Sequence, residues 1–261
     1  MKVLWIGLIA LISLIGCEVL EETDITREAD FMEEKRGTVF HEKTPLSLSS
    51  DEDVDKNVAE YDEENELYVV SNPDEVDVYV NKKRRLPEGY EPDDLVAPDV
   101  EHLSPEGDNR RLLREEAADA LEDLFSEALD AGHNLIAVSG YRSEDRQRTL
   151  YNSYVEQHGQ EEADRFSARP GTSEHQTGLA MDISAASVSF GLEEAFSGTN
   201  EGEWVKDNAH HFGYVIRYPE GKTDITGYVY EPWHLRYVGE ELATHLYTES
   251  LTLEEYFGYH Y

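Results

Sequence analysis

The sequence contains a single cysteine, Cys17, among 261 residues. An internal disulfide is therefore excluded, and the folded chain has to be stabilised by its core. Basic residues are also scarce, since 22 Lys and Arg stand against 57 Asp and Glu, and the formal net charge is -35. The densest basic run, KKRR at 82–85, is too short to form a basic patch. We expect no nucleic acid partner, because a polyanion would be repelled.

Long hydrophobic runs are absent except at the N-terminus, where Lys2 precedes a mainly apolar run from Val3 to Ile15. The run is shorter than the roughly 20 residues of a membrane-spanning helix, and it is typical of a secretory signal. No A-x-A cleavage site follows it. It ends instead in LIGC at 14–17, which resembles the lipobox of bacterial lipoproteins, in which the cysteine is lipidated and becomes the new N-terminus. A structural cysteine at the end of a signal anchor is the alternative.

The lipobox predicts a lipoprotein signal peptide over residues 1–16 and a lipid anchor on Cys17, which would hold the protein on the outer face of the bacterial cytoplasmic membrane. The next segment, 17–65, is rich in acidic residues and has no apolar periodicity. It cannot bury enough apolar surface to offset its conformational entropy, and we interpret it as a disordered acidic linker. The packed domain is expected over residues 66–261.

Within that domain, helical and strand-like patterns alternate irregularly. Predicted helices cover 109–131, 143–159 and 202–212, with Gly132 and Gly159 as stops and Ser143 as a cap. Predicted strands cover 134–142, 214–219 and 227–239, after two short β-rich runs around a turn at Asn72 and Pro73. Because the strands and helices show no regular βαβ order, the sequence favours the α+β class.

One stretch with potential metal ligands is SEHQTGLAMD at 173–182, in which His175 and Asp182 are seven residues apart. In a flat strand this odd spacing would place the two side chains on opposite faces. Thr177 and Gly178 could supply a turn that brings them together. Ordinary polar residues on a loop are the alternative.

A second stretch is EPWH at 231–234. Pro232 keeps the segment extended, so Glu231 and His234 can reach one point only if a bulge or a sharp twist turns them. His234 could then complete a His-Asp-His metal site, which would leave Glu231 free to act as a general base. A strand-end histidine packed beside Trp233 is the alternative.

Together with GYRS at 140–143, the segments 169–183 and 225–239 closely resemble the VanY-type D-alanyl-D-alanine carboxypeptidases. This family of zinc metallopeptidases also includes L,D-carboxypeptidases that act on cell-wall peptides. The resemblance extends from about residue 66 to near the C-terminus. It implies a single α+β catalytic domain with a small antiparallel sheet and flanking helices, of the hedgehog/DD-peptidase-like kind. It also implies one zinc ion bound by His175, Asp182 and His234, with Glu231 as the catalytic acid and base.

The resemblance implies roles for further residues. Arg142 matches the arginine that helps to stabilise the polarised carbonyl, and Gln147 and Ser173 match substrate-binding positions. An exopeptidase must also bind a terminal carboxylate, for which an arginine fork is suited, and Arg142 and Arg169 are both candidates. Trp233 is expected to form a wall of the site, with core packing as the alternative.

These features predict a monomeric zinc carboxypeptidase that removes the terminal D-alanine from peptidoglycan stem peptides at the cell surface. One alternative is an L,D-carboxypeptidase that acts on tetrapeptide stems, because the motifs are shared. Another is a non-catalytic, zinc-containing module that binds wall peptides. The presence of both Glu231 and Arg142 favours an enzyme.

Overall fold

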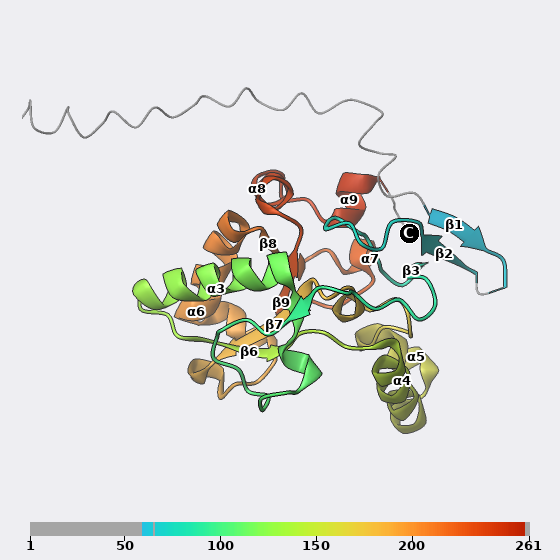
Figure 1. Ribbon diagram of the computed structural model, residues 1–261, viewed down its shortest axis with the longest axis horizontal. Helices are drawn as coiled ribbons and strands as arrows, with labels where there is room; N and C mark the ends of the chain where they lie inside the picture. Colours follow the sequence, from blue (N-terminus) through green and yellow to red (C-terminus); the bar gives the residue numbers. More distant parts are fainter. Residues whose placement is uncertain (1–58, 65, 259–261) are drawn as a thin grey trace, which may run out of the picture. The chain divides into compact units, whose positions relative to one another are not determined.

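The computed structural model describes residues 59–64 and 66–258. The centre of this part is an antiparallel four-stranded sheet in the order β6-β7-β9-β8 (Figure 1). Its strands are β6 (Leu135–Ser139), β7 (Ala180–Ala185), β9 (Glu231–Tyr237) and β8 (Tyr214–Tyr218). There are two smaller sheets. One contains β1 (Ala59–Asp62), β2 (Leu67–Val70) and β3 (Arg84–Arg85), and the other pairs β4 (Leu95–Val96) with β5 (Leu113–Arg114).

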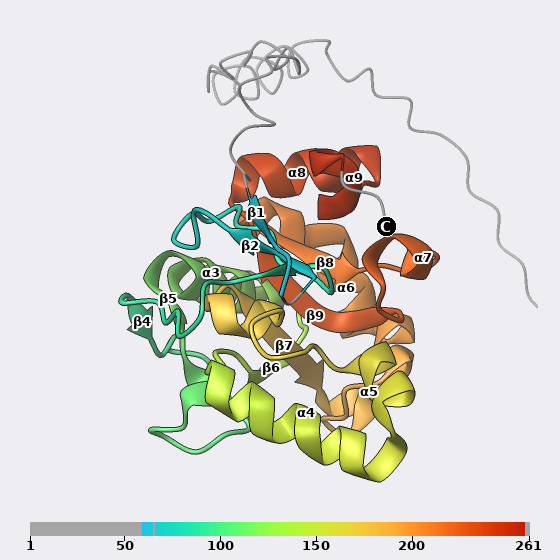
Figure 2. The same cartoon turned by 90° about the vertical axis from the view of Figure 1, so that its right-hand side faces the viewer.

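Helices surround the central sheet. The α-helices are α3 (Glu115–Asp130), α4 (Glu144–His158), α5 (Gln160–Phe166), α6 (Asn200–Asn208), α7 (Thr223–Thr226), α8 (Glu240–Glu249) and α9 (Leu253–Phe257). Short 3-10 helices are η2 (Asn109–Arg111), η3 (Glu174–Thr177), η4 (Ala186–Val188), η5 (Glu194–Gly198) and η6 (Ala209–Phe212). In Figures 1 and 2, α8 and α9 lie at one end of the sheet, and α4 and α5 lie at the other. The predicted α+β class is confirmed. No helix in the described ranges is long and apolar enough to cross a membrane.

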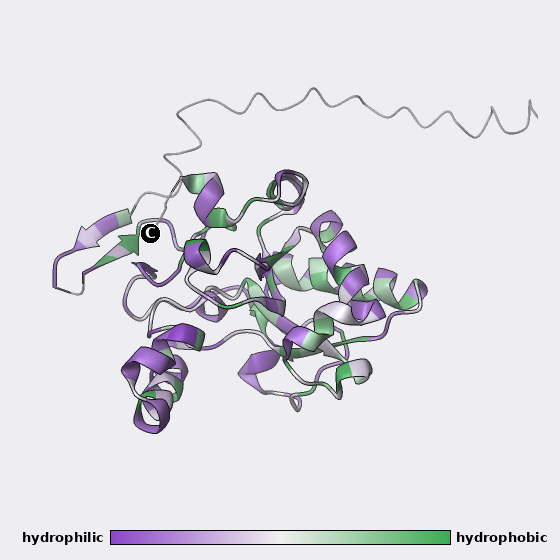
Figure 3. Cartoon of the chain, turned by 180° about the vertical axis from the view of Figure 1, so that it is seen from behind, coloured by the Kyte–Doolittle hydropathy of each residue, from purple (hydrophilic) through white to green (hydrophobic). Residues whose placement is uncertain are grey.

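The main core lies between α3 and the sheet. The apolar stripe of α3, which includes Leu121 and Leu124, is completely buried, and burying a leucine contributes roughly 2 kcal/mol. All six residues of β7 are buried, because this strand lies inside the sheet and is covered on both faces. Figure 3 shows hydrophobic colours on the central strands and mainly hydrophilic colours on α4 and α5. Asp182 on β7 is therefore placed in the interior.

Some element boundaries differ from the prediction. The helix expected over 109–131 begins at Glu115, because the preceding residues form η2 and β5, which pairs with β4. β7 was not predicted, since a strand buried on both faces lacks the alternation that identifies a strand. β1 begins at Ala59, inside the segment assigned to the linker. The predicted signal peptide, Cys17 and most of that linker lie outside the described residues.

Candidate active site

The chain turns sharply between His175 and Asp182. His175 lies in η3, which ends at Gly178 with a φ of 70°, in the left-handed region that favours glycine. The Thr177 hydroxyl donates to the Glu174 carbonyl oxygen at 2.6 Å and accepts from the Leu179 amide at 3.1 Å. The chain then enters β7 and reaches Asp182. The turn predicted at Thr177 and Gly178 is confirmed.

His234 reaches the same point from β9. Asp182 and His234 are direct cross-strand partners in the β7–β9 ladder. On the other side of β9, Ile216 pairs with Leu235 but Tyr218 pairs with Glu231, so β9 contains extra residues between the two pairs. This irregularity is the predicted bulge, and it places Glu231 next to the site rather than on the opposite face.

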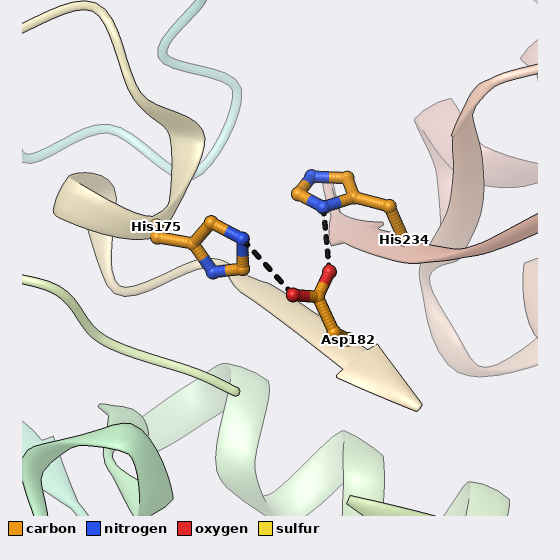
Figure 4. Close-up of side chains that lie close together, drawn as sticks. All are labelled: His175, Asp182 and His234. Carbon is orange, nitrogen blue, oxygen red and sulfur yellow. Dashed lines mark hydrogen bonds and ion pairs between the residues drawn. The ribbon is translucent and has the colours of Figure 1, made fainter. Parts of the chain in front are cut away.

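The three predicted ligands converge (Figure 4). His234 Nδ1 lies 2.9 Å from Asp182 Oδ1, and His175 Nε2 lies 3.4 Å from Asp182 Oδ2. All three side chains are buried, and one donor atom from each lies within 4.8 Å of the others. The structure thus brings together an η3 histidine, a β7 aspartate and a β9 histidine.

The partners on the far side of each imidazole indicate which atoms face a metal. His175 Nδ1 lies 2.9 Å from the Gly140 carbonyl oxygen, so it carries the proton. His234 Nε2 lies 3.5 Å from the Glu174 carboxylate, a group that only accepts, which favours a proton on this nitrogen. When both imidazoles are neutral, His175 Nε2 and His234 Nδ1 direct their lone pairs at the Asp182 carboxylate. A cation between these atoms would remove the repulsion. Two imidazole nitrogens and a carboxylate suit zinc.

Without a metal, protons compensate the same charge. Burial lowers the pKa of His234, but its contacts with the carboxylates of Asp182 and Glu174 outweigh burial and raise the pKa to about 9. Burial also lowers the pKa of His175. The pKa of Asp182 is held well below its usual range, because the two histidines outweigh its burial. Metal binding at this site therefore competes with protons.

Glu231 lies beside the three residues but is not one of the grouped donors. Burial raises the pKa of its carboxyl group to about 7, while His234 lowers it and Asp182 raises it further. A carboxyl group with a pKa near neutrality can both accept and return a proton at physiological pH.

Arg142 is a cation close to Asp182. Its backbone amide donates to the His175 carbonyl oxygen at 3.1 Å, and its guanidinium interacts with Asp182. Arg142 and Asp182 line a cavity of about 610 Å³, which is large enough for a peptide. Gln147 is completely buried and accepts from Arg142 Nη1 at 2.8 Å, while its amide donates to the Ala168 carbonyl oxygen at 2.6 Å. The structure thus places Gln147 behind Arg142, and its role in substrate binding stays a prediction.

The family comparison agrees with this geometry. The pattern of the VanY family, described as D-alanyl-D-alanine carboxypeptidase, matches residues 110–240. The chain belongs to the VanY family. YodJ of Bacillus subtilis (strain 168), a protein named as a candidate carboxypeptidase, is 52% identical over 191 residues, which cover 73% of this chain and 70% of YodJ.

Two solved structures have a similar fold. The LdcB LD-carboxypeptidase is 49% identical with a TM-score of 0.75, and the alignment covers 78% of this chain and 95% of LdcB. A VanY D,D-pentapeptidase variant from a VanB-type resistance cassette, in complex with Zn(II), is 35% identical with a TM-score of 0.55 and coverages of 69% and 98%. This VanY chain is therefore a metallopeptidase of the carboxypeptidase class, as predicted, and its donor set fits zinc.

Arg169, Ser173 and Trp233 are the remaining predicted site residues. Arg169 forms an ion pair with Asp164 at 2.8 Å. Ser173 is buried at the start of η3, and Trp233 is partly buried against the main core. A part in substrate binding stays a prediction for all three.

Glu174 is a residue of the site that the sequence motifs did not identify. It is completely buried, and its Oε1 accepts from Arg217 Nε at 2.6 Å and from Arg236 Nη1 at 3.1 Å. Its Oε2 lies 3.5 Å from His234 Nε2. Arg217 also pairs with Glu254 of α9 at 2.7 Å. The only signal in the sequence was its position next to His175, since its partners come from distant segments.

Proposed function

We propose that this VanY family member is a zinc-dependent carboxypeptidase that removes the terminal D-alanine from peptidoglycan stem peptides. The observation that carries the proposal is the convergence of His175, Asp182 and His234 with Glu231 beside them but outside the donor group. Arg142 and the cavity next to Asp182 supply space and positive charge for a peptide. Relatives named for D,D- and LD-peptidase activities support the substrate class.

The residues have separate roles in this proposal. His175, Asp182 and His234 would hold the zinc ion, which when bound acts as a Lewis acid toward water and the peptide carbonyl. Glu231 accepts the proton of the attacking water and then donates it to the leaving amine. The Arg142 guanidinium stabilises the negative charge that develops on the carbonyl oxygen.

The residue before the terminal D-alanine has the D-configuration in the pentapeptide stem and the L-configuration in the tetrapeptide stem, so there are two candidate substrates. The family description names the D-alanyl-D-alanine bond, whereas the LD-carboxypeptidase LdcB is more similar to this chain than the VanY D,D-pentapeptidase is, at 49% against 35% identity. This difference favours the tetrapeptide stem, in which the terminal D-alanine follows an L-centre. The pentapeptide stem is the second candidate.

The test is digestion of synthetic tetra- and pentapeptide stems by the purified protein. We expect release of one D-alanine, faster from the tetrapeptide, with loss of activity after chelation and recovery on addition of zinc. Mass spectrometry of the products identifies the bond. Turnover of neither peptide by the zinc-loaded protein would favour the non-catalytic wall-peptide module instead.

We also propose that the protein is anchored to the outer face of the cytoplasmic membrane through a lipid on Cys17, following the lipobox at 14–17. Replacing Cys17 with Ala should prevent the attachment of lipid. It should also move the protein out of the membrane fraction, since stable anchoring needs the acyl chains. Metabolic labelling with a radioactive fatty acid, followed by membrane fractionation, measures both effects. Equal labelling of the variant and the wild-type protein would contradict the anchor.

A further inference from the structure

Lys82 lies after β2, outside the residues 110–240 that match the family pattern. Its side chain is half-buried, and its ammonium donates to the backbone carbonyl oxygen of Asp164. The ammonium also lies over the ring of Tyr228, 4.3 Å from the ring centroid. These contacts hold the charge at a defined place.

Aromatic contacts connect that place with the catalytic residues. Tyr228 stacks on Tyr218 with ring centroids 4.4 Å apart, and Tyr218 stacks on His234 at 5.0 Å. Gly227, with a φ of 77°, lies against the Lys82 chain, since a Cβ at this position would be 3.1 Å from Lys82 Cδ. The segment that begins at Gly227 continues through Tyr228 to Glu231. The Glu231 carboxylate interacts electrostatically with the Lys82 ammonium.

Three other cations around the site have carboxylate partners, whereas Arg142 donates to Gln147 and Ser139. Arg169 is paired with Asp164, and Arg217 and Arg236 are neutralised by the buried Glu174. Within residues 59–64 and 66–258, no carboxylate oxygen lies within 4.0 Å of the Lys82 ammonium. Burial lowers the pKa of Lys82, although Asp164 and Glu231 act in the opposite direction. An anion bound beside it would offset this cost of burial.

We infer that Lys82 binds the terminal carboxylate of the substrate. The inference rests on the proposed function and extends it to the specificity for a free chain end. Glu231 returns a proton to the leaving amine, and in D-alanine that amine and the carboxylate are attached to the same carbon. A cation on the Glu231 side therefore lies where the carboxylate has to be, while Arg142 remains available to the carbonyl oxygen. Lys82 also lines a cavity of about 460 Å³, together with Asp164 and Arg169.

The experiment compares two stem peptides that differ only at the C-terminus, one with a free carboxylate and one with a carboxamide. We expect the wild-type protein to prefer the carboxylate by about 10- to 100-fold in kcat/KM, the range for a charge-assisted contact. Lys82→Met should lose this preference, mainly through a higher KM for the carboxylate peptide. The ratio does not depend on the folded fraction, because the same molecules cleave both peptides.

Lys83→Met is the matched control, since Lys83 is the neighbouring lysine and lines the same cavity. It should keep the wild-type ratio, and Lys82→Arg should retain part of it. A Lys82→Met protein that keeps the full preference, or that loses activity equally on both peptides, would overturn the inference. A wild-type protein that cleaves neither peptide would instead overturn the proposed function itself.

Discussion

Replacing Glu231 with Gln should lower kcat for stem-peptide hydrolysis by about 10²- to 10⁴-fold, the usual contribution of a general base. The amide has nearly the same size but cannot accept the proton of the attacking water. Zinc content should stay at the wild-type level, because Glu231 is not one of the three grouped donors. Steady-state kinetics and atomic absorption on the same preparation measure the two effects separately.

The same substitution should not destabilise the metal-free protein. The pKa of Glu231 rises from its usual value of 4.5 to about 7 on folding, so the folded state binds this proton more tightly than the unfolded chain. The resulting stabilisation is fully present below pH 4.5 and is lost as the pH rises through about 7. Glutamine carries no charge at any of these pH values. After chelation, Glu231→Gln should therefore unfold at an equal or higher temperature than the wild-type protein at pH 8.

Glu220→Gln is the control, because it removes a carboxylate that is exposed and outside the site. It should leave kcat and stability within experimental error of the wild-type values. A fully active Glu231→Gln protein would remove Glu231 from the reaction. A variant that loses its zinc would place Glu231 among the ligands.

Replacing Glu174 with Gln should have the largest effect on stability. Its carboxylate neutralises two buried arginines, and the loss of one partner from a buried ion pair costs about 3–5 kcal/mol. The zinc affinity should fall by about 10- to 100-fold, because the carboxylate also holds His234 through its Nε2 atom. Denaturant unfolding and competitive zinc titration measure the two quantities.

Glu162→Gln provides the comparison for this prediction. Glu162 pairs with Arg165 at 3.1 Å, but both side chains are more than half exposed, so the loss should be about 0–1 kcal/mol with no change in zinc affinity. If Glu174→Gln bound zinc as tightly as the wild-type protein, the orientation of His234 would have to depend on its bond to Asp182 and its stacking on Tyr218 alone.

Local signals in the sequence predicted local structure well. Ser143 caps α4 and Gly159 ends it, as expected, because capping depends on side chains next to the backbone groups that they satisfy. The turn at Thr177 and Gly178 and the bulge in β9 followed from the requirement that ligands with unfavourable spacing reach one point. The strand β7 could not be predicted in this way, because its complete burial depends on neighbours on both faces.

The sequence by itself determined which residue types are available for chemistry: His175, Asp182 and His234 as donors, Glu231 as a free carboxylate, and Arg142 as a nearby cation. Only the tertiary structure decided that Asp182 lies directly across from His234, that the Glu174 carboxylate lies against His234 Nε2, and that Lys82 comes near Glu231. The physical reason is that these contacts join segments far apart along the chain. Their distances are set by strand register and core packing, which spacing along the sequence does not encode.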